Sequence, residues 1–162
     1  MFGLLNDNPV AAKAGVTVRR PADEVFNFIG AGFFENYPRW SPEVIDLKLL
    51  TPGPVGLGTM ARQVRVDQGN RSESTFKVTV FQPCQCVRFE GVSNPYVCEY
   101  SLEPDNDRKV TRVVFVFELL RLELYMRPFE KLIRIAIQDG AERTVRNIKR
   151  LIEEEAAALA GQ

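Results

Sequence analysis

The chain has 162 residues, of which 45% are hydrophobic and 26% are charged, and its 21 basic residues equal its 21 acidic ones. This composition is typical of a globular protein with its own hydrophobic core, and the balanced charge gives no electrostatic footprint for nucleic acid. The absence of histidine removes the commonest general base and most zinc, copper and non-haem iron sites. We therefore expect no metal, no cofactor and no nucleic-acid partner, and most hydrolase and metalloenzyme classes are excluded.

The cysteines and the start of the chain indicate a cytoplasmic protein. Cys84, Cys86 and Cys98 are odd in number and match neither a zinc spacing nor a redox C-x-x-C motif, so we expect reduced thiols. Residues 1–14 lack a cationic segment followed by a long apolar run, and no stretch of about 18 apolar residues occurs anywhere. We predict no integral membrane segment, and transient membrane contact stays open.

The first forty residues predict a strand followed by short helices. Residues 1–14 are expected to form a loosely ordered arm. Residues 16–20 are rich in β-formers and end at Pro21, and residues 22–29 carry acids in their first turn, as a helix N-terminus prefers. A second short helix with several aromatic residues is expected over 33–40.

Alternation with a period of two then predicts antiparallel strands from Glu43 to Tyr125. Turn residues interrupt the alternation at 51–58, 67–70, 93–95 and 104–107. The last strand is expected to be long, from Lys109 to Tyr125. It is followed by an amphipathic helix whose stripe contains Phe129, Ile133, Ile137, Gly140, Thr144, Ile148 and Leu151.

No repeat, low-complexity tract or linker divides the chain, so we predict a single domain over residues 15–155 and a frayed tail over 156–162. The order of a strand, short helices, antiparallel strands and one long terminal helix indicates an α+β protein in which a curved sheet covers one stripe of that helix.

Three runs of sequence resemble a known family. They are Val-Thr-Val-Arg-Arg-Pro-Ala-Asp-Glu-Val-Phe-Asn-Phe-Ile at 16–29, Tyr-Pro-Arg-Trp-Ser-Pro-Glu-Val at 37–44 and Pro-Val-Gly-Leu-Gly-Thr at 54–59. In this order and spacing they resemble the polyketide cyclase/dehydrase and lipid-transport family of the START-like, Bet v 1-like superfamily. The likeness extends over residues 16–155.

The resemblance implies a helix-grip fold: a curved seven-stranded antiparallel sheet wrapped around the long C-terminal helix, with an internal cavity for a hydrophobic ligand. It implies no particular reaction, because members range from cyclases to passive carriers. We expect a ligand-binding set within residues 40–140, and no catalytic residue is assigned. The set is Trp40, Met60, Arg62, Phe76, Val78, Phe89, Tyr96, Tyr100, Phe115, Phe129, Ile133, Ile137 and Gly140.

Arg62 is the charged member of this set. The alternation that turns Met60 and Val64 inward turns Arg62 inward with them, and a buried guanidinium needs an anionic or polar partner. One interpretation is an anchor for an acidic ligand head. The alternatives are a β-bulge that rotates Arg62 to solvent and a structural ion pair.

Other members of the set have structural alternatives as well. Tyr96 and Tyr100 lie on one face of a predicted strand, where their hydroxyls can orient a ligand or reach water. Trp40 forms either a lid over the pocket or a plug at one end of the core. Gly140 interrupts the helical stripe at a cost of about 1 kcal/mol relative to alanine, which makes room for a ligand or for close packing of the sheet.

Three hypotheses of function remain at this stage. The first is binding or transport of a hydrophobic small molecule such as a lipid, quinone or polyketide. The second is a polyketide aromatase/cyclase that acts by positioning and enolate stabilisation. The third is a protein-interaction module. We favour the first, and lean toward a protein that is not an enzyme. Whether any reaction is catalysed and the oligomeric state are left open.

Overall fold

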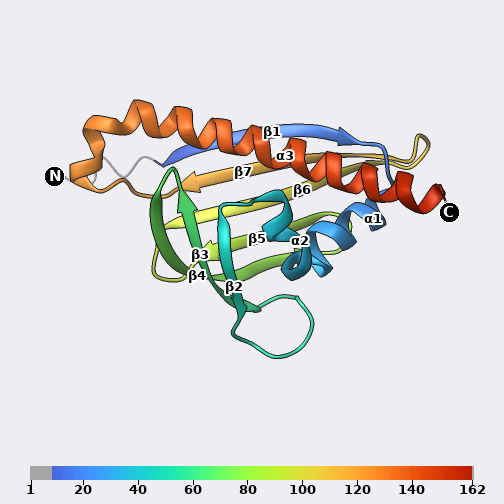
Figure 1. The fold of residues 1–162 in the computed structure, drawn as a ribbon, viewed down its shortest axis with the longest axis horizontal. Helices are drawn as coiled ribbons and strands as arrows, with labels where there is room; N and C mark the ends of the chain where they lie inside the picture. The colour runs from blue at the N-terminus through green and yellow to red at the C-terminus, as the bar shows by residue number, and fades with distance from the viewer. Residues whose placement is uncertain (1–8, 162) are drawn as a thin grey trace.

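The computed structural model describes residues 9–161, which fold into one curved sheet, several short helices and one long helix (Figure 1). The strands are β1 (Val10–Val18), β2 (Val44–Leu49), β3 (Met60–Asp67), β4 (Asn70–Gln82), β5 (Cys86–Gly91), β6 (Tyr96–Asp105) and β7 (Val110–Leu119). The helices are α1 (Ala22–Phe26), the π-helical η2 (Asn27–Ala31), α2 (Phe33–Trp40), the 3-10 helix η3 (Leu124–Phe129) and α3 (Glu130–Ala160).

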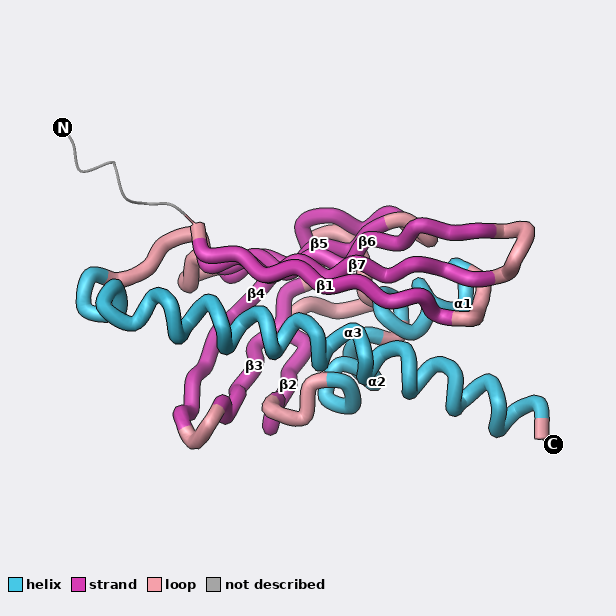
Figure 2. The backbone as a smooth tube through the Cα atoms, turned by 90° about the horizontal axis from the view of Figure 1, so that it is seen from above, coloured by secondary structure: helices cyan, strands magenta, loops and turns pink. Residues whose placement is uncertain are grey.

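The described strands form a single antiparallel sheet in the order β1-β7-β6-β5-β4-β3-β2. Strands β2 to β7 follow one another as a meander, and β1 then pairs with β7, so β1 and β2 are the two edges. Figure 2 shows α3 running beside β1 along the sheet, with α1 and α2 near its C-terminal half. The concave face of the sheet is the one turned toward these helices.

Local sequence explains two features that shape the sheet. The β3–β4 hairpin turns at Gln68 and Gly69, whose φ angles of 52° and 86° suit a tight two-residue turn between Asp67 and Asn70. In β4 the register shifts between Val78 and Val80, which is the signature of a β-bulge. After the bulge Phe81 again packs against the core.

Helix α3 packs on the sheet with only part of its length. Its buried residues are Ala141, Val145, Ile148 and Ile152, which repeat at helical spacing and all follow Gly140. The helix lies mainly along β1 and to a smaller extent along β7. Of the predicted stripe, Ile148 is fully buried, whereas Phe129 is 56% exposed.

The predicted helix-grip fold is confirmed, and three predicted boundaries are wrong. Strand β1 begins at Val10, inside the predicted arm, because Val10 and Ala12 are buried where β1 pairs with β7. Strand β7 ends at Leu119, not at Tyr125. Leu119 is the last residue that has partners on both sides, namely Val10 and Tyr96. Helix α3 continues to Ala160, past the predicted fraying at residue 156. The rest of the arm, residues 1–8, lies outside the described residues.

Three further features bear on the expectations from sequence. No helix within residues 9–161 combines the length and the apolar character needed to cross a bilayer. The same residues contain no group of three or more cysteine, aspartate or glutamate side chains arranged to hold a metal ion. Cys84, Cys86 and Cys98 are free thiols.

Candidate functional site

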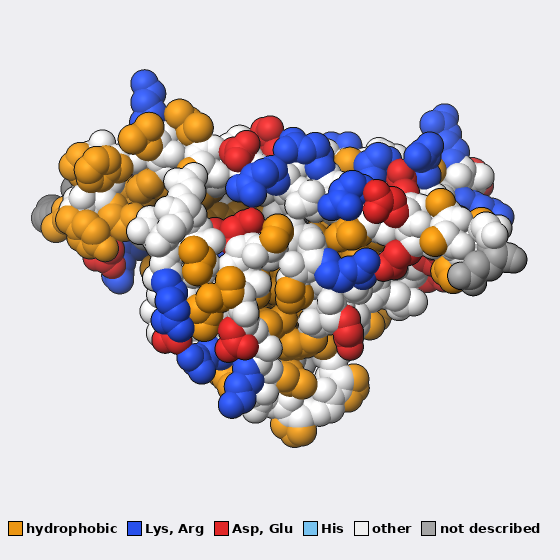
Figure 3. Space-filling model, in the orientation of Figure 1, with side chains coloured by type: hydrophobic (Ala, Val, Ile, Leu, Met, Phe, Trp, Pro, Cys, Tyr) orange, Lys and Arg blue, Asp and Glu red, His pale blue; other side chains and the backbone are white. Residues whose placement is uncertain are grey.

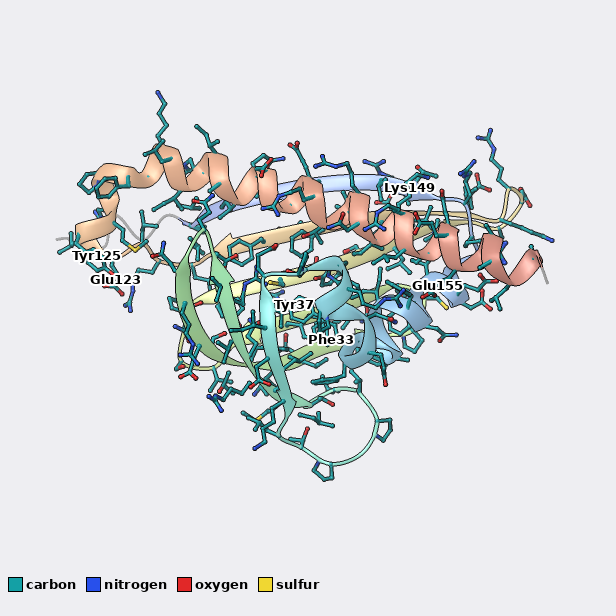
Figure 4. All side chains as sticks on the ribbon, in the orientation of Figure 1. Phe33, Tyr37, Glu123, Tyr125, Lys149 and Glu155 are labelled. Carbon is teal, nitrogen blue, oxygen red and sulfur yellow. The ribbon has the colours of Figure 1, made fainter. Side chains whose placement is uncertain are left out.

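A chain of polar side chains lies on the concave face of the sheet. Arg65 of β3 donates from Nη1 to the Tyr37 hydroxyl of α2 at 2.8 Å, and Tyr37 donates to Oε1 of Gln63 at 2.8 Å. Gln63 donates from Nε2 to Ser74 Oγ on β4 at 3.2 Å and to the Tyr96 hydroxyl on β6 at 3.4 Å. We call these five residues the polar chain. It joins one helix and three strands, and α2 brings Phe33 and Tyr37 into the space between α3 and β2 (Figure 4).

The positive charge of Arg65 is balanced at the rim of the site. Asp67 accepts from Nε of Arg65 at 3.1 Å and from Nη2 at 3.0 Å, and Glu43 lies 3.7 Å from Nη2. Ser41 Oγ accepts from Nη1 at 3.1 Å. The Arg65 side chain is 25% exposed, so one side of the guanidinium meets carboxylates near solvent and the other meets Tyr37 in the interior.

The hydrogen atoms of the polar chain do not all find acceptors. Ser74 and Tyr96 both accept from Gln63 and are 3.1 Å from each other, so one of the two hydroxyls donates to the other. The remaining hydroxyl hydrogen has no acceptor among the described residues. The indole Nε1 of Trp40 is also buried without an acceptor there; the Tyr100 hydroxyl is near it but outside hydrogen-bond geometry. The Trp40 donor is costly because it is buried, whereas Ser74 and Tyr96 are half-buried.

Burial keeps the acidic hydrogens of this region in place at neutral pH. Burial raises the pKa of Tyr37, of Tyr96 and of Tyr100, and it raises the pKa of the Cys98 thiol to about 12. Burial alone would lower the pKa of Arg65, but its interactions with Tyr37 and Asp67 more than offset this effect. The site therefore presents neutral hydroxyl donors and one permanent cation, and Cys98 is not a thiolate nucleophile.

Six predicted ligand-binding residues pack into one aromatic and aliphatic core beside the polar chain. Each is at most 6% exposed: Trp40, Phe76, Val78, Phe89, Tyr100 and Phe115. The rings contact one another closely. Phe33 stacks on Phe89 with centroids 4.4 Å apart, and Tyr100 lies 4.8 Å from Phe115 and 5.8 Å from Trp40. Side chains rather than space fill this part of the concave face.

Another part of the concave face is more open. Tyr96, Cys98 and Phe117 on the sheet and Ile137 on α3 are only partly buried, and all four pack against the core. In the space-filling view, hydrophobic side chains are visible between the long helix and the strands (Figure 3). Of the predicted set, Tyr96 and Ile137 lie in this region, and Ile133 is half-buried one turn earlier on α3.

The predicted inward orientation of Arg62 is wrong. Its side chain is 43% exposed and forms an ion pair with Glu73 on β4, which is one of the alternatives considered from the sequence. Ala61 belongs to the core, and because side chains alternate along a strand, Met60 and Arg62 point to the opposite face. An unpaired inward Arg62 would have cost several kcal/mol, whereas Gln63 and Arg65 are tolerated inside because the polar chain satisfies them.

Two other predicted residues differ from expectation. Phe129 lies in η3 and is 56% exposed, so it does not line the concave face. A Cβ added to Gly140 would meet only Nη2 of Arg143, at 3.9 Å, so close packing against the sheet does not account for this glycine.

The predicted internal cavity does not coincide with either of two clefts on the described surface. A cleft of about 700 Å³ is lined by residues including Arg19, Glu24 and Lys109. A smaller one of about 280 Å³ lies between β1 and α3 beside Lys13 and Gln138. Neither contains a member of the predicted ligand-binding set, so the ligand cavity stays a prediction.

Sequence analysis identified Tyr96 but missed the other four members of the polar chain: Tyr37, Gln63, Arg65 and Ser74. Side chains of the strand 60–67 alternate between its two faces, and each face carries an arginine. The face with Met60, Val64 and Val66 has more apolar residues, so the number of apolar residues favoured the wrong face as the inward one. Tyr37 was missed because it is one of several aromatic residues in the predicted short helix, and nothing set it apart from the others. The sequence did contain one indication of this site. Gln63 and Arg65 are two polar residues on the same face of the strand as the small residue Ala61.

The chain belongs to the polyketide cyclase/dehydrase and lipid-transport family, whose model matches residues 9–153. This confirms the resemblance drawn from the three sequence runs. A comparison with curated proteins gives no match.

Solved structures share the fold of this chain at low sequence identity. The Zhui aromatase/cyclase from Streptomyces sp. R1128 superposes with a TM-score of 0.76 at 13% identity, covering 92% of this chain and 96% of that one. The protein TTHA0849 from Thermus thermophilus gives 0.70 at 17% identity, with 90% and 98% covered. A major latex-like protein from Panax ginseng gives 0.65 at 12% identity, with 88% and 97% covered. These likenesses show a shared fold.

Proposed function

We propose that the protein binds a hydrophobic small molecule that carries a carbonyl or similar acceptor oxygen, with its apolar body on the open part of the concave face. One observation carries this proposal: one hydroxyl hydrogen of the Ser74–Tyr96 pair has no acceptor among the described residues. A ligand oxygen placed there would accept that hydrogen while the ligand body contacts Cys98, Phe117 and Ile137.

The expected energetics follow from this arrangement. Affinity comes mainly from apolar burial, at about 25 cal/mol per Å². One neutral hydrogen bond adds about 0.5 to 1.5 kcal/mol, which corresponds to roughly two- to tenfold in affinity. The polar chain thus selects among ligands of similar shape rather than supplying most of the affinity. Quinones and polyketides carry such oxygens, and a lipid ester does as well.

The proposal is tested with two probes of nearly the same shape, 2-acetylnaphthalene and 2-isopropenylnaphthalene, of which only the first has an acceptor oxygen. Isothermal titration calorimetry should show that the parent protein prefers the ketone by about two- to tenfold. The double variant Ser74→Ala/Tyr96→Phe should bind both probes equally. The control Tyr125→Phe changes a hydroxyl-bearing side chain that is 76% exposed and lies far from Tyr37 (Figure 4), and it should keep the preference. No preference in the parent protein contradicts the proposal.

Native mass spectrometry of the protein purified from its own host would identify the natural ligand. We expect a co-purified hydrophobic molecule with at least one acceptor oxygen. A co-purified pure hydrocarbon would argue against a role for the polar chain.

A second candidate, a cyclase of poly-β-keto chains, is favoured by the contact between Arg65 and Tyr37. A permanent cation that donates to a protonated phenol can stabilise negative charge on an enolate oxygen bound beside them. A group needed mainly in the transition state affects turnover more than affinity. With a poly-β-keto mimic, Tyr37→Phe should then lower turnover far more than binding, and a parent protein that forms no cyclised product excludes this candidate.

A further inference from the structure

A group of exposed hydrophobic side chains gathers at one end of the molecule, away from the polar chain. Figure 3 shows it over η3 and the start of α3, and Figure 4 shows Tyr125 at this end, far from Tyr37. We call this group the apolar tip. Its members are Leu120 (40% exposed), Leu124 (76%), Tyr125 (76%), Phe129 (56%), Leu132 (65%) and Ile135 (62%).

Packing of the fold does not require these side chains to be apolar. In the first half of α3, Ile133 and Ile137 are half-buried and provide the apolar contacts on the side of the helix toward the sheet. Leu132 and Ile135 lie on other sides of the helix and are more than half exposed. Contiguous exposed apolar groups of this kind mark surfaces that contact a partner or a membrane.

The charges around the apolar tip indicate what covers it. Residues 120–135 hold four cations (Arg121, Arg127, Lys131, Arg134) and two carboxylates (Glu123, Glu130), although the whole chain has a net charge of zero. Arg134 is paired with Glu130, and the tip still carries more cations than carboxylates in a chain whose formal net charge is zero. Anionic lipid headgroups attract such cations when they lie near the membrane surface.

A second copy of the chain fits this pattern less well. In a twofold dimer the same patch meets itself, so a patch with more cations than carboxylates would face a second patch with the same excess of positive charge. Like charges placed opposite one another in an interface oppose association. The tip also lies at the end of the long axis of the molecule, where a flat lipid surface can reach it (Figure 1).

We propose that the apolar tip docks on the surface of an anionic membrane, with Leu132 and Ile135 entering the interface and the neighbouring cations contacting lipid headgroups. This is the pattern of an interfacial helix, which combines apolar burial with attraction to anionic lipids. The proposal concerns a surface separate from the polar chain, so it stands or falls independently of ligand binding.

The test is co-sedimentation of the full chain with phosphatidylcholine vesicles that contain or lack phosphatidylglycerol. The parent protein should bind the anionic vesicles, and added salt should weaken that binding. The variant Leu132→Ser/Ile135→Ser should bind them about tenfold less or weaker still, because two inserted apolar side chains are removed. The variant Arg121→Gln/Lys131→Gln should also bind less. The control Leu57→Ser/Leu159→Ser removes side chains that are 74% and 72% exposed elsewhere and should bind like the parent.

Several outcomes would overturn the proposal. They are no vesicle binding by the parent protein, equal binding to neutral and anionic vesicles, and equal loss in the tip variant and the control. A parent dimer that the tip substitutions convert to a monomer, with vesicle binding unchanged, would assign the tip to a second copy instead. Binding of 2-acetylnaphthalene is measured in parallel. The tip variant should bind it as the parent does, so that this measurement tests the proposed function separately from membrane docking.

Discussion

Two arginines three positions apart on β3 have opposite roles. Arg62 points outward to an ion pair with Glu73, and Arg65 points inward to Tyr37. The residue type alone does not distinguish them. Their partners do, because an inward guanidinium is stable only where several acceptors converge, as Asp67 and Ser41 do on Arg65. The cation on the concave face is therefore Arg65.

Glu153 on α3 provides a residue-scale prediction about acid stability. It accepts from the Arg19 backbone and side chain and from Lys149, and the hydrogen bonds from Arg19 lower its pKa from the ordinary value of 4.5 to about 2. A carboxylate with a lowered folded pKa stabilises the protein above its unfolded pKa, and this contribution is lost as the pH falls through the folded pKa.

We therefore expect Glu153→Gln to lower the free energy of unfolding at neutral pH. The difference from the parent should shrink as the pH falls from 4.5 to about 2. Urea denaturation at a series of pH values measures this difference. Glu154→Gln, in which the replaced side chain is 64% exposed, is the control and should show a much smaller dependence. A difference for Glu153→Gln that stays constant with pH would contradict the assignment.

At the scale of elements, α3 consists of two halves with different surroundings. The part after Gly140 buries Ala141, Val145, Ile148 and Ile152, and Asn147 donates to the backbone oxygen of Trp40 at the end of α2. Its first half shows apolar side chains to solvent at Leu132 and Ile135. Gly140 lies at the boundary between the two halves.

The substitution Gly140→Ala tests whether the fold requires glycine at this position. The added Cβ meets only Arg143 Nη2 at 3.9 Å, and alanine is favoured over glycine inside a helix by about 1 kcal/mol. We expect a higher midpoint of thermal unfolding by circular dichroism. Gly140→Leu should keep most of this stability, and weaker probe binding in that variant would mean that the ligand occupies the space beside residue 140. A lower thermal midpoint for Gly140→Ala than for the parent would show that the space around residue 140 is not open.

At the scale of the whole molecule, one core joins the short helices, the sheet and the second half of α3. Trp40 contacts Phe28, Phe33 and Tyr100, and so links the short helices to β6. The sheet closes around this core from β1 to β4, since Ala12, Val113, Phe89 and Phe76 all belong to it. Such a single core favours cooperative unfolding.

The only tryptophan of the chain lies at the centre of this core and reports on it. During urea unfolding we expect the Trp40 fluorescence transition to coincide with the far-ultraviolet circular dichroism transition, which is dominated by the 31 residues of α3. A circular dichroism change at lower urea concentration would show that the first half of α3 unfolds separately from the core.

The sequence by itself determined the order of the elements, the antiparallel meander and the amphipathic C-terminal helix. These features follow from local periodicity and turn residues, which each segment carries independently. The same local signals found most of the buried aromatic residues, including Phe76, Phe89 and Tyr100, because apolar side chains on one face of a strand collect in the core.

Only the tertiary structure decided which face of β3 points inward, where β7 ends and which half of α3 is covered. Each depends on a partner distant in the chain: cross-strand pairing for β3, the ends of β1 and β6 for β7, and the length of the sheet for α3. The polar chain likewise joins residues from Tyr37 to Tyr96 that no local period connects. Hydrogen bonds between distant elements make its polar groups tolerable inside, and that compensation exists only once the sheet has formed.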